Sequence, residues 1–269
     1  MTFVKVSIQI GAIAAKLKNY NVALRSFVLF LTFSFIVSGC ASHVSGITGS
    51  NDAVTIAAGS DVAIERLVAP YRDRIDADMN TVLSFAPQTL DKSGKWQTPV
   101  GNVFADAALA AANHILSTRE NKHVDFCMLN AGGVRSIIAQ GNVTTRVAYE
   151  LMPFDNSLVV LELDGPTIME LLAYFVSERK PHPLAGITFT IEGGKATNVR
   201  IDGQPFSIDG RYLVATNDYL YNGGDKMTFF KKASAKYDLD YKLRNVLIDY
   251  FSTHDTIMAN AAQRVREIN

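Results

Sequence analysis

The sequence predicts an α+β fold in which helices flank a mixed β-sheet. Segments with helical apolar spacing are interspersed along the chain with short segments of strand-like length. Several of the strands are separated by Gly-containing turns of hairpin length, at 193–194, 202–203 and 209–210. Interspersed helices combined with hairpin-length turns favour a mixed sheet over a doubly wound parallel one.

The composition is that of an ordinary globular domain. The chain has 269 residues, 48% of them hydrophobic and 19% charged, so it can bury a sizeable core. It has only two cysteines, which excludes a disulfide-rich fold. The formal net charge is zero, with 26 basic and 26 acidic residues, and this excludes a protein that binds nucleic acid through its overall charge.

Five segments are predicted to be helices. Ser60 and Asp61 cap the first helix, whose apolar residues at 64, 67, 68, 71, 75 and 79 share one face. Pro70 is expected to break or kink this helix. A linker is expected at 87–99. The other predicted helices are 103–116, 166–177, 239–250 and 257–268.

Six segments are predicted to be strands, at 125–129, 143–149, 158–163, 187–191, 196–201 and 212–215. Cys127 lies in the first of them. We expect it to be a buried structural thiol and not a nucleophile, because no accompanying His/Asn pattern supports catalysis.

Residues 1–39 are predicted to be a lipoprotein signal peptide. Residues 1–50 contain four cations and no acid, and an almost unbroken apolar run at 27–37 follows the cations. This run is shorter than the ~20 residues that a membrane-spanning helix needs. It ends at Val37-Ser38-Gly39-Cys40, small residues before a cysteine, which resembles the lipobox of bacterial lipoproteins.

That resemblance implies a lipid on Cys40, a flexible tether over the rest of 40–58 and a folded domain at 59–269. The alternatives are a core helix with an incidental cysteine, or an uncleaved anchor. No Asp follows Cys40 as a retention signal, so a lipid-anchored protein of the bacterial outer membrane, facing the periplasm, is expected. Beyond residue 50 the chain has 22 basic and 26 acidic residues, so the expected domain is mildly acidic.

The first motif that could carry function is LNAGGVR at 129–135, directly after a predicted strand. Paired glycines allow a tight turn and the close approach of a ligand, and Arg135 offers a bidentate fork for phosphate. A Gly-Gly turn that only ends the strand is the alternative.

The second motif, LMPFDN at 151–156, places Phe154 at the apex of a turn. An aromatic ring in this position either stacks on a planar base or fills a space in the core.

The third motif is NDYLYNGGD at 217–225. A carboxylate on a Gly-rich loop, here Asp225, can accept hydrogen bonds from both hydroxyls of a ribose, and the nearby tyrosines can stack on a base. An ordinary solvated turn fits the same residues.

Together the three segments resemble a known family, the C-terminal domain of 5′-nucleotidases. The similar stretches are LNAGGVR, VAYELMPFDNSLVVLELDG at 147–165 and YLVATNDYLYNGGD at 212–225. GNVFADA at 101–107 is similar to the start of a helix of that domain. Order and spacing agree from about residue 64 to residue 230.

The resemblance implies a role for each of five residues. Asn130 matches an asparagine that touches the nucleotide, and Arg135 matches a phosphate-binding arginine. Phe154 and Tyr219 fall where two aromatic rings sandwich the base, the second being commonly Phe. Asp225 matches the ribose-binding carboxylate.

Three positions depart from the family pattern. Ala131 and Lys226 each stand where the family has Gly, so a positive φ at Ala131 would be strained. Near 94–96, where the family has further phosphate-binding arginines, Lys95 is the one cation and could substitute only as a point charge.

In these enzymes a separate metallophosphoesterase domain holds two metal ions that activate the attacking water. None of the five histidines here lies in a motif of the required kind, and His182, between two prolines, is expected to be an exposed loop residue. We therefore expect no catalytic residue, no metal site and no cofactor on this chain, with divalent metals on a partner chain.

Two functions of different class remain open. The chain is either the nucleotide- or nucleoside-binding half of a split 5′-nucleotidase, with hydrolysis supplied by a metallophosphoesterase on another chain, or a non-catalytic nucleotide-binding lipoprotein tethered at the cell surface.

Overall fold

The computed structural model describes residues 20, 22, 24–31, 49, 59 and 61–268. The chain divides into two units, Met1–Gly59 and Ser60–Asn269. In the first unit, residues 24–31 are helical and exposed. Within the described residues, no helix is both long and apolar enough to cross a bilayer. Cys40 and most of the predicted signal peptide and tether lie outside them.

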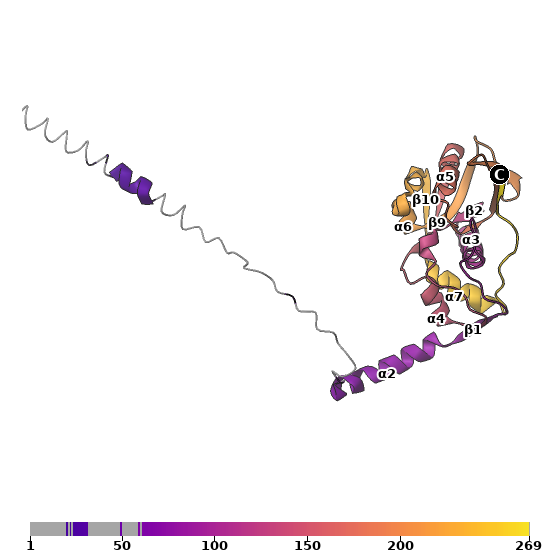
Figure 1. Cartoon of the computed structure of the whole chain (residues 1–269), viewed down its shortest axis with the longest axis horizontal. Helices are drawn as coiled ribbons and strands as arrows, with labels where there is room; N and C mark the ends of the chain where they lie inside the picture. The colour runs from indigo at the N-terminus through magenta and orange to yellow at the C-terminus, as the bar shows by residue number, and fades with distance from the viewer. Residues whose placement is uncertain are drawn as a thin grey trace, which may run out of the picture. The chain divides into compact units, whose positions relative to one another are not determined.

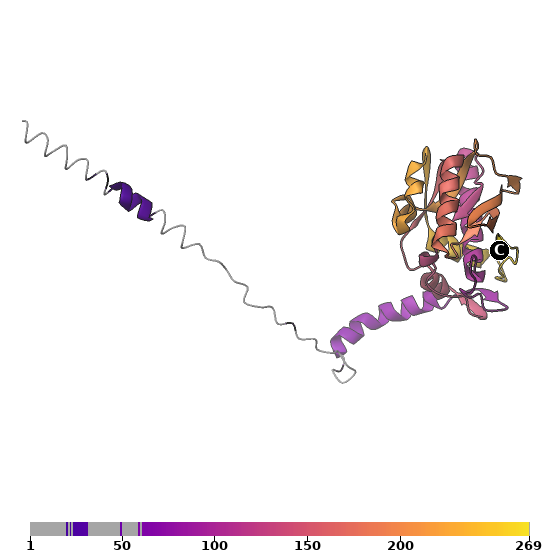
Figure 2. The same cartoon turned by 45° about the horizontal axis from the view of Figure 1, so that its top comes forward.

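The second unit begins with helix α2 (Val62–Met79), capped by Asp61, whose carboxylate accepts from the backbone N–H of Ala63 at 2.8 Å. The helix continues through Pro70, so the break predicted there is absent. It buries none of its residues. It leads into β1 (Val82–Ala86), which pairs antiparallel with β3 (Gly141–Thr144). Figure 2 shows α2 extending from the rest of this unit.

The central sheet has five strands in the order β10-β4-β9-β2-β5. Strands β2 and β9 are parallel, and the other three pairs are antiparallel. The predicted mixed sheet is therefore confirmed. The strands are β2 (Phe126–Met128), β4 (Ser157–Asp164), β5 (Leu184–Ala185), β9 (Arg211–Asn217) and β10 (Ala235–Lys242).

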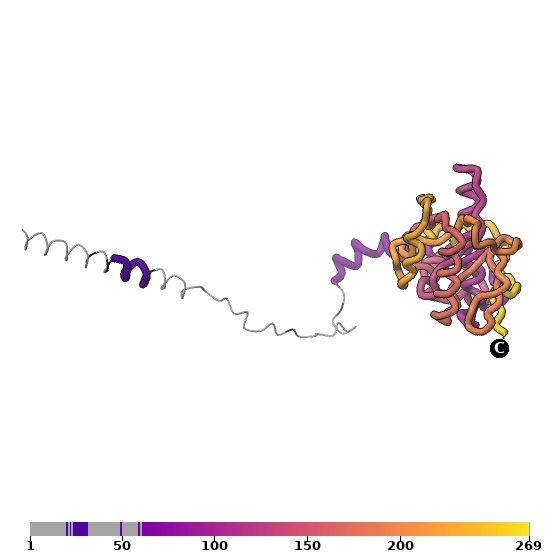
Figure 3. Tube along the Cα trace, turned by 90° about the horizontal axis from the view of Figure 1, so that it is seen from above, coloured from indigo at the N-terminus to yellow at the C-terminus, as the bar shows by residue number. Residues whose placement is uncertain are grey.

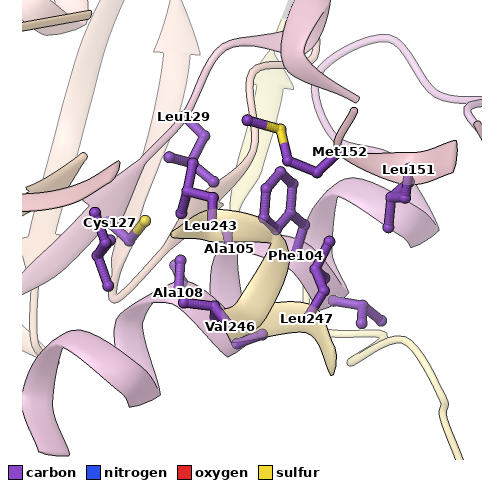
Figure 4. Packing of buried hydrophobic residues seen from close by; sticks show 14 of the residues in the cluster. Phe104, Ala105, Ala108, Cys127, Leu129, Leu151, Met152, Leu243, Val246 and Leu247 are labelled. Atoms are coloured by element: carbon purple, nitrogen blue, oxygen red, sulfur yellow. The ribbon is translucent and has the colours of Figure 1, made fainter. Parts of the chain in front are cut away.

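Helices cover both faces of this sheet (Figure 1). Alternate residues of β4 point to opposite faces, so Leu158 and Val160 join one core cluster while Val159 and Leu161 join the other. The first cluster contains residues of α3 (Pro99–Glu120), α4 (Thr145–Leu151) and α7 (Leu243–Thr253). Figure 4 shows Phe104 of α3 within it. The second cluster contains α5 (Gly165–Glu178).

A second, four-stranded sheet in the order β11-β6-β7-β8 contributes its apolar side chains to the α5 cluster. Its strands are β6 (Ile187–Glu192), β7 (Lys195–Ile201), β8 (Gln204–Pro205) and β11 (Val265–Ile268). Figure 3 shows the C-terminal strand at the periphery of the trace.

Cys127 is fully buried in the first cluster, as predicted, and burial raises the pKa of its thiol.

Two predicted elements are wrong, at 143–149 and 257–268, and a third, at 239–250, is a helix that was predicted to begin too early. The strand predicted at 143–149 is the end of β3 followed by α4. The helix predicted at 239–250 begins four residues later, because 235–242 is strand β10, whose Tyr237, Leu239 and Tyr241 alternate with polar residues. That period of two was readable in the sequence.

The helix predicted at 257–268 is absent, and the chain there is irregular until β11. Tertiary contacts override local propensity in this segment. Ile257 is buried and donates its backbone N–H to Phe85 O at 2.9 Å. The guanidinium of Arg264, 6% exposed, forms an ion pair with Asp106 of α3 at 2.5 Å and donates to the carbonyl of Leu184.

Candidate functional site

The three predicted motifs meet because of how their strands pair. Strands β2 and β9 run parallel, so the loops after them leave the same edge of the sheet. Strand β4 runs antiparallel to β9, with Leu158 opposite Asn217, so the loop before β4 enters at that edge. Asn130 follows β2, Phe154 precedes β4, and Tyr219 lies on the short helix α6 (Asp218–Tyr221) after β9.

A cavity of about 310 Å³ lies between these loops. All five predicted binding residues line it, which the sequence alone could not establish. Asn156 also lines it and was not predicted. The complete lining is Asn130, Gly132, Gly133, Arg135, Phe154, Asn156, Tyr219 and Asp225.

The carboxylate of Asp225 is held by two donors. The amide of Asn130, itself 6% exposed, donates to Oδ2 at 2.7 Å, and the hydroxyl of Tyr219 donates to Oδ1 at 2.9 Å. The hydroxyl of Tyr174 donates to the backbone carbonyl of Asp225 at 2.7 Å. Each carboxylate oxygen has more than one acceptor position, so Asp225 is oriented and can still accept hydrogen bonds from a ligand.

The two aromatic rings that line the cavity, Phe154 and Tyr219, are each 43% exposed. Half-exposed rings at a cavity wall leave a face free for stacking. The guanidinium of Arg135 lies over the Phe154 ring, 5.9 Å from its centroid, and donates to the carbonyl of Gly132 at 3.4 Å. Arg135 has no carboxylate partner among the described residues, so its charge is available to an anion.

Two glycines allow this close arrangement. A Cβ at Gly133 would lie 2.9 Å from Oδ1 of Asn130, and a Cβ at Gly224 would lie 2.4 Å from the Tyr219 ring. Because these two positions have no side chain, the Asn130 amide can pack against Gly133 and the Tyr219 ring against Gly224 while both side chains reach Asp225.

Comparison with known proteins identifies the domain. A family model described as the 5′-nucleotidase C-terminal domain matches residues 78–232. This chain belongs to that family.

Several similar proteins are nucleotidases or phosphoesterases. A 5′-nucleotidase of Vibrio parahaemolyticus is 24% identical over 208 residues, covering 74% of this chain and 35% of that protein. The trifunctional nucleotide phosphoesterase protein YfkN of Bacillus subtilis is 33% identical over 160 residues, covering 54% of this chain and 10% of that protein. This chain thus spans well under half the length of these relatives.

The fold is also that of solved 5′-nucleotidases. The 5′-nucleotidase precursor of Thermus thermophilus superposes with a TM-score of 0.65 at 23% identity, covering 78% of this chain and 44% of that one. The expected α+β fold of a 5′-nucleotidase C-terminal domain is therefore confirmed.

The departures from the family pattern have unequal consequences in the structure. Ala131 begins a short 3-10 turn, Ala131–Gly133, and is not among the residues with positive φ, so alanine causes no backbone strain there. Lys226, by contrast, has φ 61° and follows Asp225 with φ 49°. A lysine in place of glycine at this left-handed position is costly, so the strain lies beside the cavity.

Lys95 does not reach this cavity. Its ammonium forms an ion pair with Glu267 of β11 and lies 5.4 Å from the centroid of the Trp96 ring. Trp96 and Glu267 line a different cavity. Arg135 is therefore the one Arg or Lys among the described residues that line the site.

His182 is not the exposed loop residue that the sequence predicts. It is 2% exposed, and its Nδ1 accepts the backbone N–H of Ala131 at 3.1 Å, so it supports the loop that carries Asn130. Desolvation by burial lowers the pKa of His182 to about 4. Because Nδ1 is an acceptor, the neutral ring carries its proton on Nε2.

Arg244 of α7, which sequence reasoning missed, contacts the loop that carries Phe154 and lies outside the family match. Its guanidinium donates to the carbonyls of Met152, Pro153 and Phe154 at 3.1–3.3 Å and pairs with Asp155 at 2.5 Å. It also lies 4.4 Å from the centroid of the Tyr149 ring. Arg244 therefore holds the loop that presents Phe154, and no local motif marks a residue about 90 positions away.

Among the described residues, no group of three or more His, Cys, Asp and Glu side chains is arranged to hold a metal ion.

We predict that Arg244→Lys loosens the Phe154 loop while the domain stays folded. A lysine keeps one positive charge but loses the planar fork that reaches three carbonyls. Loss of one or two hydrogen bonds should speed amide exchange in the segment 152–157 by about tenfold. Hydrogen–deuterium exchange read by mass spectrometry measures this. Arg211→Lys, which alters an exposed ion pair with Glu162, is the matched control and should leave the segment unchanged. Equal exchange in both variants would contradict the role given to Arg244.

We also predict that His182 makes the domain less stable in acid. Its folded pKa of about 4 is below the ordinary value of 6.5, so the unfolded chain binds the proton more readily. The stability that neutral His182 contributes is complete above pH 6.5 and is lost as pH falls toward 4, by about 2–3 kcal/mol at pH 4.5. His182→Asn can keep the bond from Ala131 through its Oδ1 and does not titrate. Urea unfolding at pH 7 and pH 4.5 should show a smaller loss in this variant than in the unaltered chain; an equal loss would refute the assignment.

Proposed function

We propose that this chain binds a nucleoside or nucleotide in the cavity between the three loops. The observation that carries the proposal is that all five residues matching the family's binding pattern line one cavity. In this arrangement the base lies between Phe154 and Tyr219, the ribose hydroxyls donate to Asp225, and Arg135 binds phosphate.

Stacking is expected to dominate the affinity. A base between two aromatic rings gains about 1–3 kcal/mol per stacked face, and every base has a π-face, so the site tolerates several bases. A base on the Arg135 side of Phe154 takes the place of the guanidinium. Arg135 is then free to turn toward a phosphate, because this movement breaks no ion pair with a carboxylate of the described residues.

Asp225 is prepared for a diol before any ligand binds. Tyr219 and Asn130 each donate one hydrogen bond to it, which fixes the plane of the carboxylate. Tyrosine at 219, where the family commonly has phenylalanine, therefore links the base-stacking ring to the ribose-binding group. Preorganisation of this kind lowers the entropy cost of binding.

We predict that Phe154→Ala and Tyr219→Ala each weaken adenosine binding about 10- to 100-fold, the loss of one stacked face. Isothermal calorimetry on the chain measures this. Tyr71→Ala removes an exposed aromatic residue outside the cavity and should bind adenosine normally. Arg135→Gln should reduce the affinity for AMP to that for adenosine. Unchanged adenosine binding in both stacking variants would refute the proposed mode.

We further propose that hydrolysis is supplied by a metallophosphoesterase on a separate chain. Divalent metal ions bound there would activate a water molecule and stabilise the charge on the transferred phosphoryl group. This chain would hold the base and ribose and so position the phosphate toward the partner. The family's occurrence within longer nucleotidases supports a role beside a phosphoesterase.

We predict that the full chain mixed with its proposed metallophosphoesterase partner, sought among the products of neighbouring genes, hydrolyses AMP faster than that partner alone in Mn²⁺ or Zn²⁺. Phe154→Ala in this chain should lower kcat/KM of the mixture about 10- to 100-fold, as it lowers binding. The idea fails if the mixture is no faster than the partner. Metal-dependent hydrolysis by the isolated chain would instead show that the catalytic residues are on this chain. Nucleotide binding without faster hydrolysis would favour the alternative function, a non-catalytic nucleotide-binding lipoprotein.

We propose, finally, that the chain is a lipoprotein of the bacterial envelope, attached through Cys40 to the outer membrane and facing the periplasm. The order of cations, apolar run and small residues before Cys40 supports this assignment. Cys40→Ser, which leaves no thiol to acylate, should release the chain from the membrane fraction.

A further inference from the structure

Helix α2 presents an apolar stripe to solvent. The stripe consists of Ile64, Leu67, Val68, Tyr71 and Ile75, which are 60%, 68%, 39%, 68% and 58% exposed. The helix is capped and regular, yet it buries none of its residues. A contiguous apolar face on a formed helix is typical of an interaction surface.

The helix is attached to the domain by a different side. Arg146 of α4 forms an ion pair with Asp76 at 3.0 Å and donates to Oδ1 of Asn80 at 3.4 Å. Asp76 is one residue beyond Ile75, about 100° around the helix. These contacts hold the C-terminal end of α2 while the stripe stays exposed.

The spacing of the stripe is that of a coiled-coil seam. Ile64, Val68, Tyr71 and Ile75 are separated by four, three and four residues, the alternation of the apolar positions in a heptad repeat. Leu67 flanks this seam. Pro70, which has no backbone N–H, lies on the outer side of the helix, about 130° from the centre of the seam.

We propose that α2 pairs with α2 of a second copy of this chain in an antiparallel two-helix interface. In the antiparallel register each seam residue faces an apolar one. Ile64 lies opposite Ile75 of the second copy, and Val68 lies opposite Tyr71. The two-fold axis passes between residues 69 and 70, so the same four residues form a self-complementary patch.

The charges that flank the seam select the antiparallel orientation. Glu65 and Arg72 occupy equivalent flanking positions, and in an antiparallel pair each lies beside the oppositely charged residue of the second copy. A parallel pair would place Arg72 beside Leu67 and form no such ion pair. Within one chain the same two residues already pair at 3.2 Å, so the ionic contact is exchanged and not lost.

A membrane surface fits this helix less well. Helices that lie on anionic bilayers carry mainly Lys and Arg on the polar face. The charged residues of α2 are three basic and four acidic, namely Arg66, Arg72, Arg74, Glu65, Asp73, Asp76 and Asp78.

The test traps the register with a disulfide. Two differently tagged full-length copies, one with Ile64→Cys and one with Ile75→Cys, are expressed together and oxidised in isolated envelopes. The antiparallel interface places the two new thiols together, so a linked mixed dimer is expected. Two copies of the same variant should not link, because in the antiparallel register their added thiols are offset by 11 residues along the seam, about 16 Å. The chain without an added cysteine gives the background, because Cys127 is fully buried and Cys40 is the proposed lipidation site.

A matched pair of substitutions tests the seam in the same assay. Val68→Asp in both copies should slow the linkage about tenfold or more, because it buries an unpaired charge. Val62→Asp alters a residue that is 63% exposed on the opposite side of α2 and should leave the rate unchanged. Both positions are exposed in the single chain, so neither change should unfold it.

No linkage in the mixture would overturn the proposal, and so would self-linkage of Ile64→Cys, which indicates a parallel pair. A rate that Val68→Asp does not change would overturn it as well. None of these outcomes depends on the nucleotide cavity, so the proposed function is tested separately.

Discussion

The parallel pairing of β2 with β9, and the antiparallel pairing of β4 on the other side of β9, is the constraint on which the site depends. The two parallel strands end at one edge, and the antiparallel strand begins there. Loops about 25 and 65 residues apart along the chain therefore meet over the same edge. A different direction for any one of the three strands would remove its loop from the cavity.

At that edge, Asp225 links the first loop, the third loop and helix α5. Its carboxylate joins Asn130 of the first loop to Tyr219 of the third, and its backbone carbonyl is held by Tyr174 of α5. These bonds stabilise two consecutive residues, Asp225 and Lys226, in the left-handed region. Strain of this kind persists only where the surroundings over-determine the conformation, and it is common at ligand sites.

The chain beyond residue 232, outside the family match, contributes contacts that hold the Phe154 loop and the C-terminal segment in place. Arg244 of α7 fixes the loop of Phe154, and Arg264 joins the C-terminal segment to α3 and β5. Burial raises the pKa of Asp106, which opposes its ionisation, while the adjacent Arg264 lowers it. One wall of the cavity, the Phe154 loop, is thus positioned by a side chain distant in sequence.

The sequence by itself determined the fold class, the family and the five candidate residues. Each of these depends on short-range signals, such as LNAGGVR after a strand or a GGD turn, that are readable without any long-range contact. It also predicted that Cys127 is buried, because the residues around it form an apolar strand of the kind found in a protein core.

Only the tertiary structure decided the rest. His182 is exposed or buried depending on what α5 and the Asn130 loop place around it, and flanking prolines carry no information about that. The segment 257–268 is irregular until β11 and not helical, and Arg264 within it contacts Asp106, 158 residues away along the chain. Such tertiary contacts outweigh a local preference for helix. The apolar residues of α2 were correctly predicted to share one face of a helix, but their spacing does not say what covers that face. Within residues 61–268 no segment buries it, because α2 contacts the domain through Asp76 and Asn80 on another side.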